Sequence, residues 1–268
     1  MNTNLFKKEL RKNMKVFLVI AIALTGFLSL TLSMYSTMQD SMATVADLYS
    51  SMPQAFQDAL NFQEGQWSHV LGFYATYFAY YGPMMTGAYA IYLGANILSR
   101  EEQHRTADFL LSKPVTRNHV ITSKLAVLAL YITIVNLVLW INGVIWTGFI
   151  AGFNNTFSQI TILHSYGLFI CYFYGILGFF ITVMMKRAKA IIGPAIGIVL
   201  FLYMFDMILR ITTKAQFLLY LTPYKYINID LLASDYHMEW WRIGILAGAI
   251  GILMAFSYLF YRRKDILL

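Results

Sequence analysis

The side chains best suited to catalysis are few and form no recognisable set. The five histidines lack the HExxH spacing, or any other close spacing, of metal ligands; they are His69, His104, His119, His164 and His237. The sequence also lacks the G-x-x-x-x-G-K-[ST] loop that cradles nucleotide phosphates and the Thr-Val-Gly-Tyr-Gly-like filter of potassium channels. We therefore expect no catalytic residue, no metal site and no bound cofactor in this chain.

A charged segment, residues 99–124, stands out in an otherwise apolar sequence. Ser99 followed by Glu102 has the spacing of a capping box, in which a hydroxyl and a carboxylate satisfy free amides at a helix start. Pro114 disfavours helix at the residue before it, so a short helix is predicted at about residues 100–112. Its apolar side chains, on a loop too short to be a domain, are Phe109, Leu110 and Leu111. A membrane surface or a partner protein should cover them.

Asp206 is an acidic residue inside an apolar stretch, near its end. Charge within a membrane is costly and therefore favours a functional role. Arg210 follows four residues later, and an ion pair between the two explains Asp206 equally well.

A run of tyrosines marks residues 74–92, where Pro83 should kink a helix by removing a hydrogen bond. Tyrosines on a kinked helix are suited to lining a cavity for an amphipathic substrate, although anchoring at the membrane interface explains Tyr74 and Tyr77 just as well. The candidate lining residues of a pathway are Tyr81, Pro83, Tyr89 and Asp206.

The composition of the chain indicates the kind of helices in which these residues lie. The chain has 268 residues, of which 59% are hydrophobic and only 12% charged, and its mean hydropathy is +0.58. Soluble domains carry about a quarter charged residues, so this composition predicts an all-α, polytopic membrane protein. The net charge of +7 would suggest nucleic acid in a soluble protein, but basic residues beside membrane spans set orientation instead.

Six spans of about 20 apolar residues are expected in a single transmembrane domain, residues 1–268. They lie at about residues 16–35, 70–98, 122–150, 162–185, 190–209 and 243–261. The turn-prone residues 152–156 divide the uncharged stretch between the third and fourth spans. The motifs Gly193-x-x-x-Gly197 and Gly244-x-x-x-Gly248 permit close helix approach, which favours packing within one subunit over a dimer seam.

The basic residues predict the orientation. Sixteen of the 20 lysines and arginines fall in the leader, residues 100–124, residues 186–189 and residues 262–264, all on one side of a six-span chain. The positive-inside rule places that side, with both termini, in the cytoplasm. In the leader, Phe6, Leu10, Met14 and Phe17 recur at helical spacing, which predicts an amphipathic helix at about residues 3–15 lying in the membrane interface; a disordered basic tail is the alternative.

The charged segment also carries a family resemblance. The string Glu101-Glu102-x-x-x-Thr106-x-x-x-Leu110-Leu111-x-x-Pro114-x-x-Arg117 resembles the loop between the second and third spans of ABC-2-type transporter permeases. The six spans, the basic leader, a helix-like stretch at residues 52–56 and the tail at residues 261–266 resemble the family as well.

This resemblance implies a function without catalysis in this chain. Residues 100–112 are expected to be a coupling helix that docks on a separate ATPase subunit, which holds the ATP and Mg²⁺. The expected contacts are Glu101, Glu102, Arg105, Thr106, Phe109, Leu110, Leu111, Pro114 and Arg117. The family implies a plasma-membrane exporter of a peptide, antibiotic or lipid-like molecule. It would be built from two permease subunits, the same or similar, and two ATPase copies, surrounded by membrane lipid and without nucleic acid.

Two other interpretations remain open from the sequence. In the first, the chain is a membrane-embedded structural or sensory protein whose cytoplasmic helix docks a partner. Alternatively, Glu101 and Glu102 resemble the Glu-Glu-x-x-x-Arg pattern of intramembrane CAAX-type proteases, which would make it a hydrolase. However, Arg105 comes one residue early for that pattern, and the pair lies in a charged loop outside the spans.

Overall fold

The computed structural model describes residues 3–60, 66–103, 116–185 and 191–263, which form helices and connections without a strand among them. The α-helices are α1 (Thr3–Met38), α2 (Met42–Ser50), α3 (Gln54–Ala59), α4 (Val70–Tyr80), α5 (Gly82–Gln103), α7 (Arg117–Ala151), α8 (Phe153–Met184), α9 (Ile192–Ile211) and α10 (Trp240–Arg263). Short 3₁₀ helices are η1 (Gln39–Ser41), η2 (Gln66–Ser68), η4 (Thr213–Leu221) and η5 (Pro223–Tyr226).

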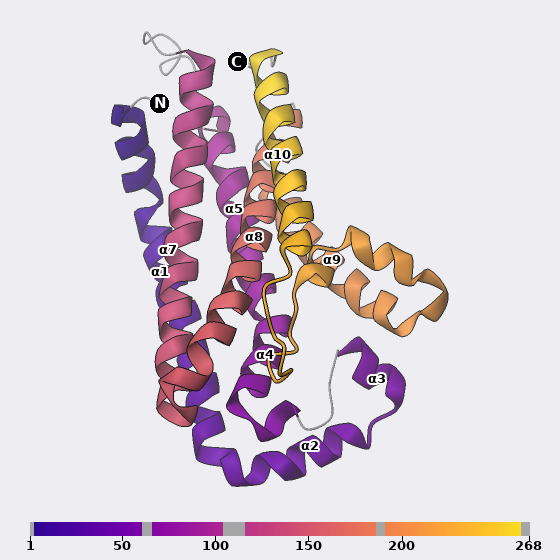
Figure 1. Ribbon diagram of the computed structural model, residues 1–268. Helices are drawn as coiled ribbons and strands as arrows, with labels where there is room; N and C mark the ends of the chain where they lie inside the picture. The colour runs from indigo at the N-terminus through magenta and orange to yellow at the C-terminus, as the bar shows by residue number, and fades with distance from the viewer. Residues whose placement is uncertain (1–2, 61–65, 104–115, 186–190, 264–268) are drawn as a thin grey trace.

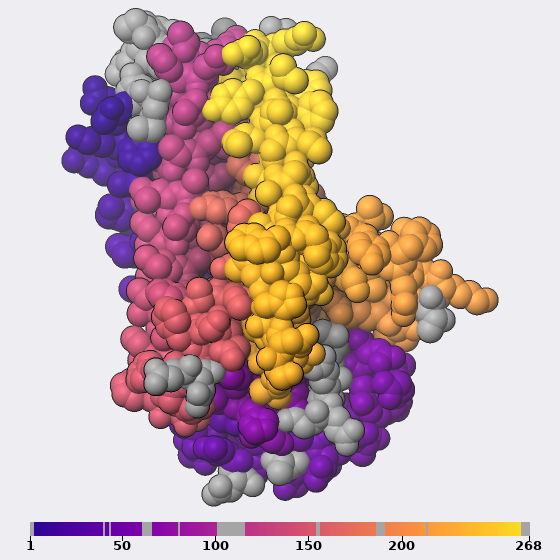
Figure 2. All heavy atoms as spheres, viewed as in Figure 1, coloured from indigo at the N-terminus to yellow at the C-terminus, as the bar shows by residue number. Residues whose placement is uncertain are grey.

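The long helices form a bundle around α8. Helix α8 packs against α5, α7 and α10, while α1 packs along α7, and α9 contacts α5 and α3. Both chain termini lie at the same end of the bundle, which we call the terminal end, and α2 and α3 lie at the opposite end (Figure 1). The orange segment of α9 and η4 projects from the bundle, with the purple residues of the α2–α3 region beneath it (Figure 2).

Five helices are long and apolar enough to cross a membrane within the described residues: α1, α7, α8, α9 and α10. The predicted multi-pass, all-α class is therefore confirmed, whereas the predicted count of six spans is not reproduced. The second expected span, residues 70–98, is divided into α4 and α5 at Tyr81. Helix α4 has only 11 residues, too few to cross a bilayer alone.

Two predicted helix starts differ from the structure. The leader is not a separate interfacial helix, because α1 runs without interruption from Thr3 to Met38 and its buried leader residues are Leu5, Glu9 and Asn13. Ser99 does not begin a helix: it lies within α5, fully buried, with its hydroxyl donating to the carbonyl of Asn96 at 3.5 Å. Burial of one helix face, which single-sequence capping patterns do not reveal, explains both differences.

The predicted division after the third span is confirmed and is sharper than expected. Gly152 alone separates α7 from α8, at φ 89°, a left-handed conformation that glycine adopts without steric cost. The fourth predicted span, residues 162–185, therefore begins earlier, at Phe153.

The close helix crossing of the bundle is made by glycines other than those expected. A Cβ on Gly94 of α5 would lie 2.0 Å from the carbonyl oxygen of Gly175 of α8, and one on Gly178 would lie 2.3 Å from that of Ile91. By contrast, a Cβ on Gly193, Gly197, Gly244 or Gly248 would meet no atom of the described residues within 4 Å. The expectation that those motifs pack within the subunit is therefore wrong.

Candidate functional site

Three helix ends are joined by a buried ion pair at the terminal end. The ammonium group of Lys124, on α7, lies 3.5 Å from the carboxylate of Glu9, on α1, with the two side chains 0% and 3% exposed. Lys124 also donates to the carbonyl of Ile97, near the end of α5, at 2.5 Å. Tyr131 of α7 donates to the carbonyl of Leu10 at 2.5 Å and fixes the leader a second time. The leader is thereby bound to the helices before and after the charged segment.

Arg117 joins the start of α7 to the end of α10. Its guanidinium donates to the carbonyl of Arg262 at 3.0 Å and to that of Tyr261 at 3.4 Å. Thr116 caps α7 by accepting from the amide of His119 at 3.3 Å. Of the predicted coupling residues, Arg117 is thus placed at the terminal end.

The other predicted coupling residues fall largely outside the described part of the chain. The backbone of Glu101 and Glu102 continues α5 to its end at Gln103. The residues outside the described ranges are Arg105, Thr106, Phe109, Leu110, Leu111 and Pro114.

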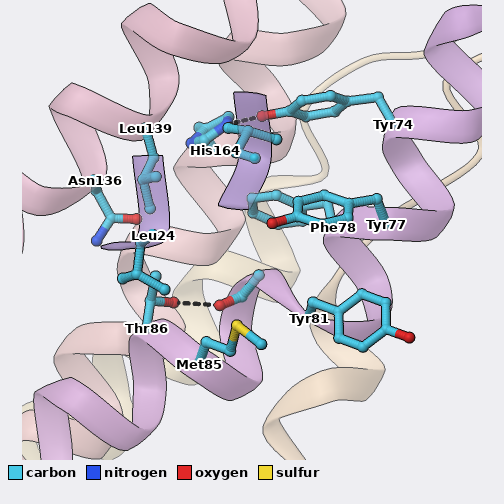
Figure 3. Close-up of a pocket in the computed structure, with 12 residues that line it drawn as sticks. Leu24, Tyr74, Tyr77, Phe78, Tyr81, Met85, Thr86, Asn136, Leu139 and His164 are labelled. Atoms are coloured by element: carbon cyan, nitrogen blue, oxygen red, sulfur yellow. Dashed lines mark hydrogen bonds between the residues drawn. The ribbon is translucent and has the colours of Figure 1, made fainter. Parts of the chain in front are cut away.

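A small cavity with a mainly apolar lining and a few polar groups lies at the junction of α4 and α5. Its volume is about 20 Å³, room for about one water molecule. Tyr74 of α4 and His164 of α8 meet beside it, with the phenol oxygen 2.6 Å from Nε2, and Thr86 closes it by donating to the carbonyl of Gly82 at 2.6 Å (Figure 3). Asn136 of α7 also lines it. The other ring nitrogen of His164, Nδ1, is buried and has no hydrogen-bond partner among the described residues.

A larger cavity lies beside the same junction, toward the α2–α3 end of the molecule. It has a volume of about 260 Å³, and we call it the aromatic chamber after its six aromatic lining residues, Tyr49, Trp67, Phe73, Tyr77, Tyr81 and Tyr203. Four elements supply these rings: α2, η2, α4 with the residue that follows it, and α9. Tyr77 and Tyr81 line both cavities, and the Tyr81 ring points away from the Tyr74–His164 pair (Figure 3).

The predicted lining residues occupy different environments. Tyr81 is 44% exposed and faces cavity space, whereas Pro83 is buried. Tyr89 is buried and its hydroxyl has no hydrogen-bond partner in the described part of the chain. The structure therefore brings Tyr81 to a cavity, while Pro83 and Tyr89 lie in the packed interior.

Asp206 is buried within a small polar cluster formed by α9 and Thr222, the residue between η4 and η5. Its carboxylate accepts from Nε of Arg210 at 2.6 Å and from the hydroxyl of Thr222 at 2.5 Å, so the ion pair anticipated from the sequence is present. Asp206 and Arg210 line a cavity of about 30 Å³, whose wall includes Tyr203 of the aromatic chamber.

A second polar cluster precedes α10. Glu239 pairs with Arg242 at 2.8 Å and accepts from Asn228 at 2.9 Å, while its amide donates to the hydroxyl of Tyr166 on α8. Burial favours the neutral acid, but hydrogen bonds from Arg242 and Trp241 outweigh it and hold the pKa of Glu239 below its ordinary value. This cluster attaches the start of α10 to α8.

Sequence reasoning missed the Lys124–Glu9 pair, the Tyr74–His164 pair and most of the aromatic chamber, of which only Tyr81 was among the predicted lining residues. Glu9 is an acid within a strongly basic leader, and that was the one available signal. The Tyr74–His164 contact joins residues 90 positions apart, and the aromatic chamber combines rings from four elements, which no local pattern reveals.

These features define a class: a multi-pass helical membrane protein whose cavities and charged clusters lie between its helices. The chain belongs to the family described as ABC-2 family transporter protein, which matches residues 3–266, nearly its whole length. It is a transporter permease, a membrane component that works with an ABC ATPase. The same chain finds no significant match among curated proteins.

Proposed function

We propose that this chain is the permease of an ABC exporter in the plasma membrane, with the terminal end in the cytoplasm. Residues 100–112, the first of which continue α5, act as its coupling helix. Two permease subunits and two ATPase copies, which hold ATP and Mg²⁺, complete the transporter, and α4 with α5 serves as the sixth span. Closure of the ATPases pushes on the coupling helices and switches the pathway between its two exposures.

The observation that carries this proposal is the joining of helices around residues 104–115. The helix before that segment, α5, and the helix after it, α7, are both bound to α1 through Lys124. Arg117 binds the same end of α7 to α10. Because these contacts are buried or short, a force applied between α5 and α7 reaches four helices instead of bending one loop.

A second permease subunit is supported by the apolar surfaces that the chain leaves uncovered. In the apolar stretch of each helix, 56% of the residues are buried in α8, but only 17% in α1 and 22% in α9. The exposed face of α9 includes Phe201, Met204 and Ile208, at the spacing of one helix face. These faces suit a partner helix or lipid. We place the pathway beside them, with Tyr81 and Asp206 as its lining residues in this subunit and Pro83 and Tyr89 shaping the helix behind it.

The proposal is tested by recruitment of the cognate ATPase. Phe109→Asp or Leu110→Asp puts a charge into an apolar contact, and we expect ATPase co-purification and transport to fall at least tenfold, corresponding to 1.4 kcal/mol or more. Phe157→Asp, on the exposed side of α8, is the matched control, and each variant must elute as a folded protein. Unchanged recruitment in both coupling variants would refute the coupling assignment.

Orientation has its own measurement. His119 is exposed near the start of α7, and the single cysteine of the chain, Cys171, is buried. A His119→Cys variant should resist a membrane-impermeant maleimide in intact cells and react after lysis. Labelling in intact cells would place the terminal end outside and remove it from any ATPase.

A further inference from the structure

The aromatic chamber combines a dense set of rings with open space between them. Tyr49 and Trp67 lie 4.5 Å apart between ring centroids, Tyr77 and Tyr81 lie 5.8 Å apart, and Trp67 is 5.9 Å from Phe73. The cavity of about 260 Å³ between these rings is slightly below the range of drug-sized pockets. It therefore suits one small group better than a whole large ligand.

The segment that supplies most of the chamber carries charged side chains of one sign. Residues 16–99, which supply five of its six rings, contain no lysine or arginine. Two acids on the same segment, Asp47 on α2 and Asp58 on α3, are exposed. On α9, which supplies Tyr203, Arg210 is engaged by Asp206 at 2.6 Å. The acidic, lysine- and arginine-free segment that supplies five of the rings therefore favours a cation over an anion.

The rings themselves also favour a cation over a neutral apolar group. The face of an aromatic ring carries partial negative charge, and cages of several rings bind quaternary ammonium groups. A neutral apolar group gains little by leaving lipid for such a chamber, because lipid tails are as apolar as its walls. The hydroxyls of Tyr77 and Tyr203 make no hydrogen bond within the described residues, so they are available as acceptors.

We propose that the aromatic chamber is a binding site for organic ammonium cations, and that the cargo of this permease carries such a group. The assignment of the ion as cargo rests on the proposed function, whereas binding to the chamber does not. Trp67 and Tyr81 are the specificity-determining residues, since each presents a ring to the cavity from a different part of the chain, Trp67 from η2 and Tyr81 directly after α4.

The test compares choline with 3,3-dimethylbutan-1-ol, which replaces the charged nitrogen by carbon and keeps the shape. Binding to the purified chain in a maltoside detergent is followed by saturation-transfer NMR titration, which needs no ATPase. We expect choline to bind at least tenfold more tightly than the neutral isostere. Equal affinity for the two compounds, or no binding of choline, overturns the proposal.

Substitutions locate the site. Trp67→Leu and Tyr81→Leu should each weaken choline binding about fivefold to thirtyfold, the range expected for a desolvated cation–ring contact, whereas Tyr81→Phe should stay within about threefold because it keeps the ring. Phe157→Leu removes a ring that packs on Trp140 outside the chamber and should leave affinity unchanged. Retained affinity in both leucine variants of the chamber overturns the assignment.

The two proposals fail in different ways. Phe109→Asp should abolish ATPase recruitment while choline affinity is kept. If choline binds as stated but the unmodified chain recruits no ATPase, the proposed function fails and the binding site stands. If recruitment is normal and choline does not bind, the cation site fails and the permease function stands.

Discussion

Removing one partner of the Lys124–Glu9 pair should destabilise the terminal end strongly. The two charges lie 3.5 Å apart with side chains 0% and 3% exposed, so at an effective dielectric constant of about 20 their attraction is about 5 kcal/mol. Lys124→Met or Glu9→Met leaves the other charge buried without its counter-charge, which costs about 3–5 kcal/mol. Combining the two substitutions removes both charges and should recover most of that loss, because an apolar pair of similar volume avoids desolvation of either charge.

The measurement is a double-mutant cycle on the purified chain in detergent, using equilibrium unfolding followed by circular dichroism. Lys8→Met is the matched control, because Lys8 is an exposed neighbour of Glu9 on the same helix, and it should change the unfolding free energy by less than about 0.5 kcal/mol. The reasoning is refuted if either single variant is as stable as the parent, or if the double variant loses the sum of the two single losses.

Two further predictions concern the helix crossing and the cluster before α10. Gly94→Ala should destabilise the bundle by about 1–3 kcal/mol through overpacking, because the added Cβ meets the Gly175 carbonyl at 2.0 Å. Gly193→Ala is the control and should not destabilise it, because no atom of the described residues lies near its Cβ. Equal thermal stability of the two variants would contradict the close crossing of α5 and α8. The pKa of Glu239 is lowered in the folded chain, so its contribution to stability is present above the unfolded pKa and is lost as pH falls through the folded pKa. Glu239→Gln should therefore be less sensitive to acid than the parent in unfolding measurements between pH 7 and 3, and an identical pH profile would remove the role of this carboxylate.

Residue order alone was sufficient for the class of protein and for most helix positions. Apolar runs such as residues 243–261 specify spans because a bilayer admits only segments that satisfy their own backbone hydrogen bonds. Gly152 and the Gly82-Pro83 pair marked a turn and a break for reasons local to the backbone. The ion pair of Asp206 with Arg210 was likewise readable, because a four-residue spacing places both on one helix face.

Tertiary structure decided which of these residues meet. In the sequence, Lys124 counted only as one of the positive charges that predict membrane orientation. In the structure its ammonium group pairs with buried Glu9, because α1 packs along α7. Gly94 and Gly175 belong to no recognisable sequence motif. The close approach of Gly94 to the carbonyl of Gly175 nevertheless sets the spacing of α5 and α8. The aromatic chamber gathers rings from four elements spread between residues 49 and 203. Local patterns report the preference of a segment for helix or membrane, whereas such contacts depend on how separate helices rotate and cross, which is set by the packing of all of them together.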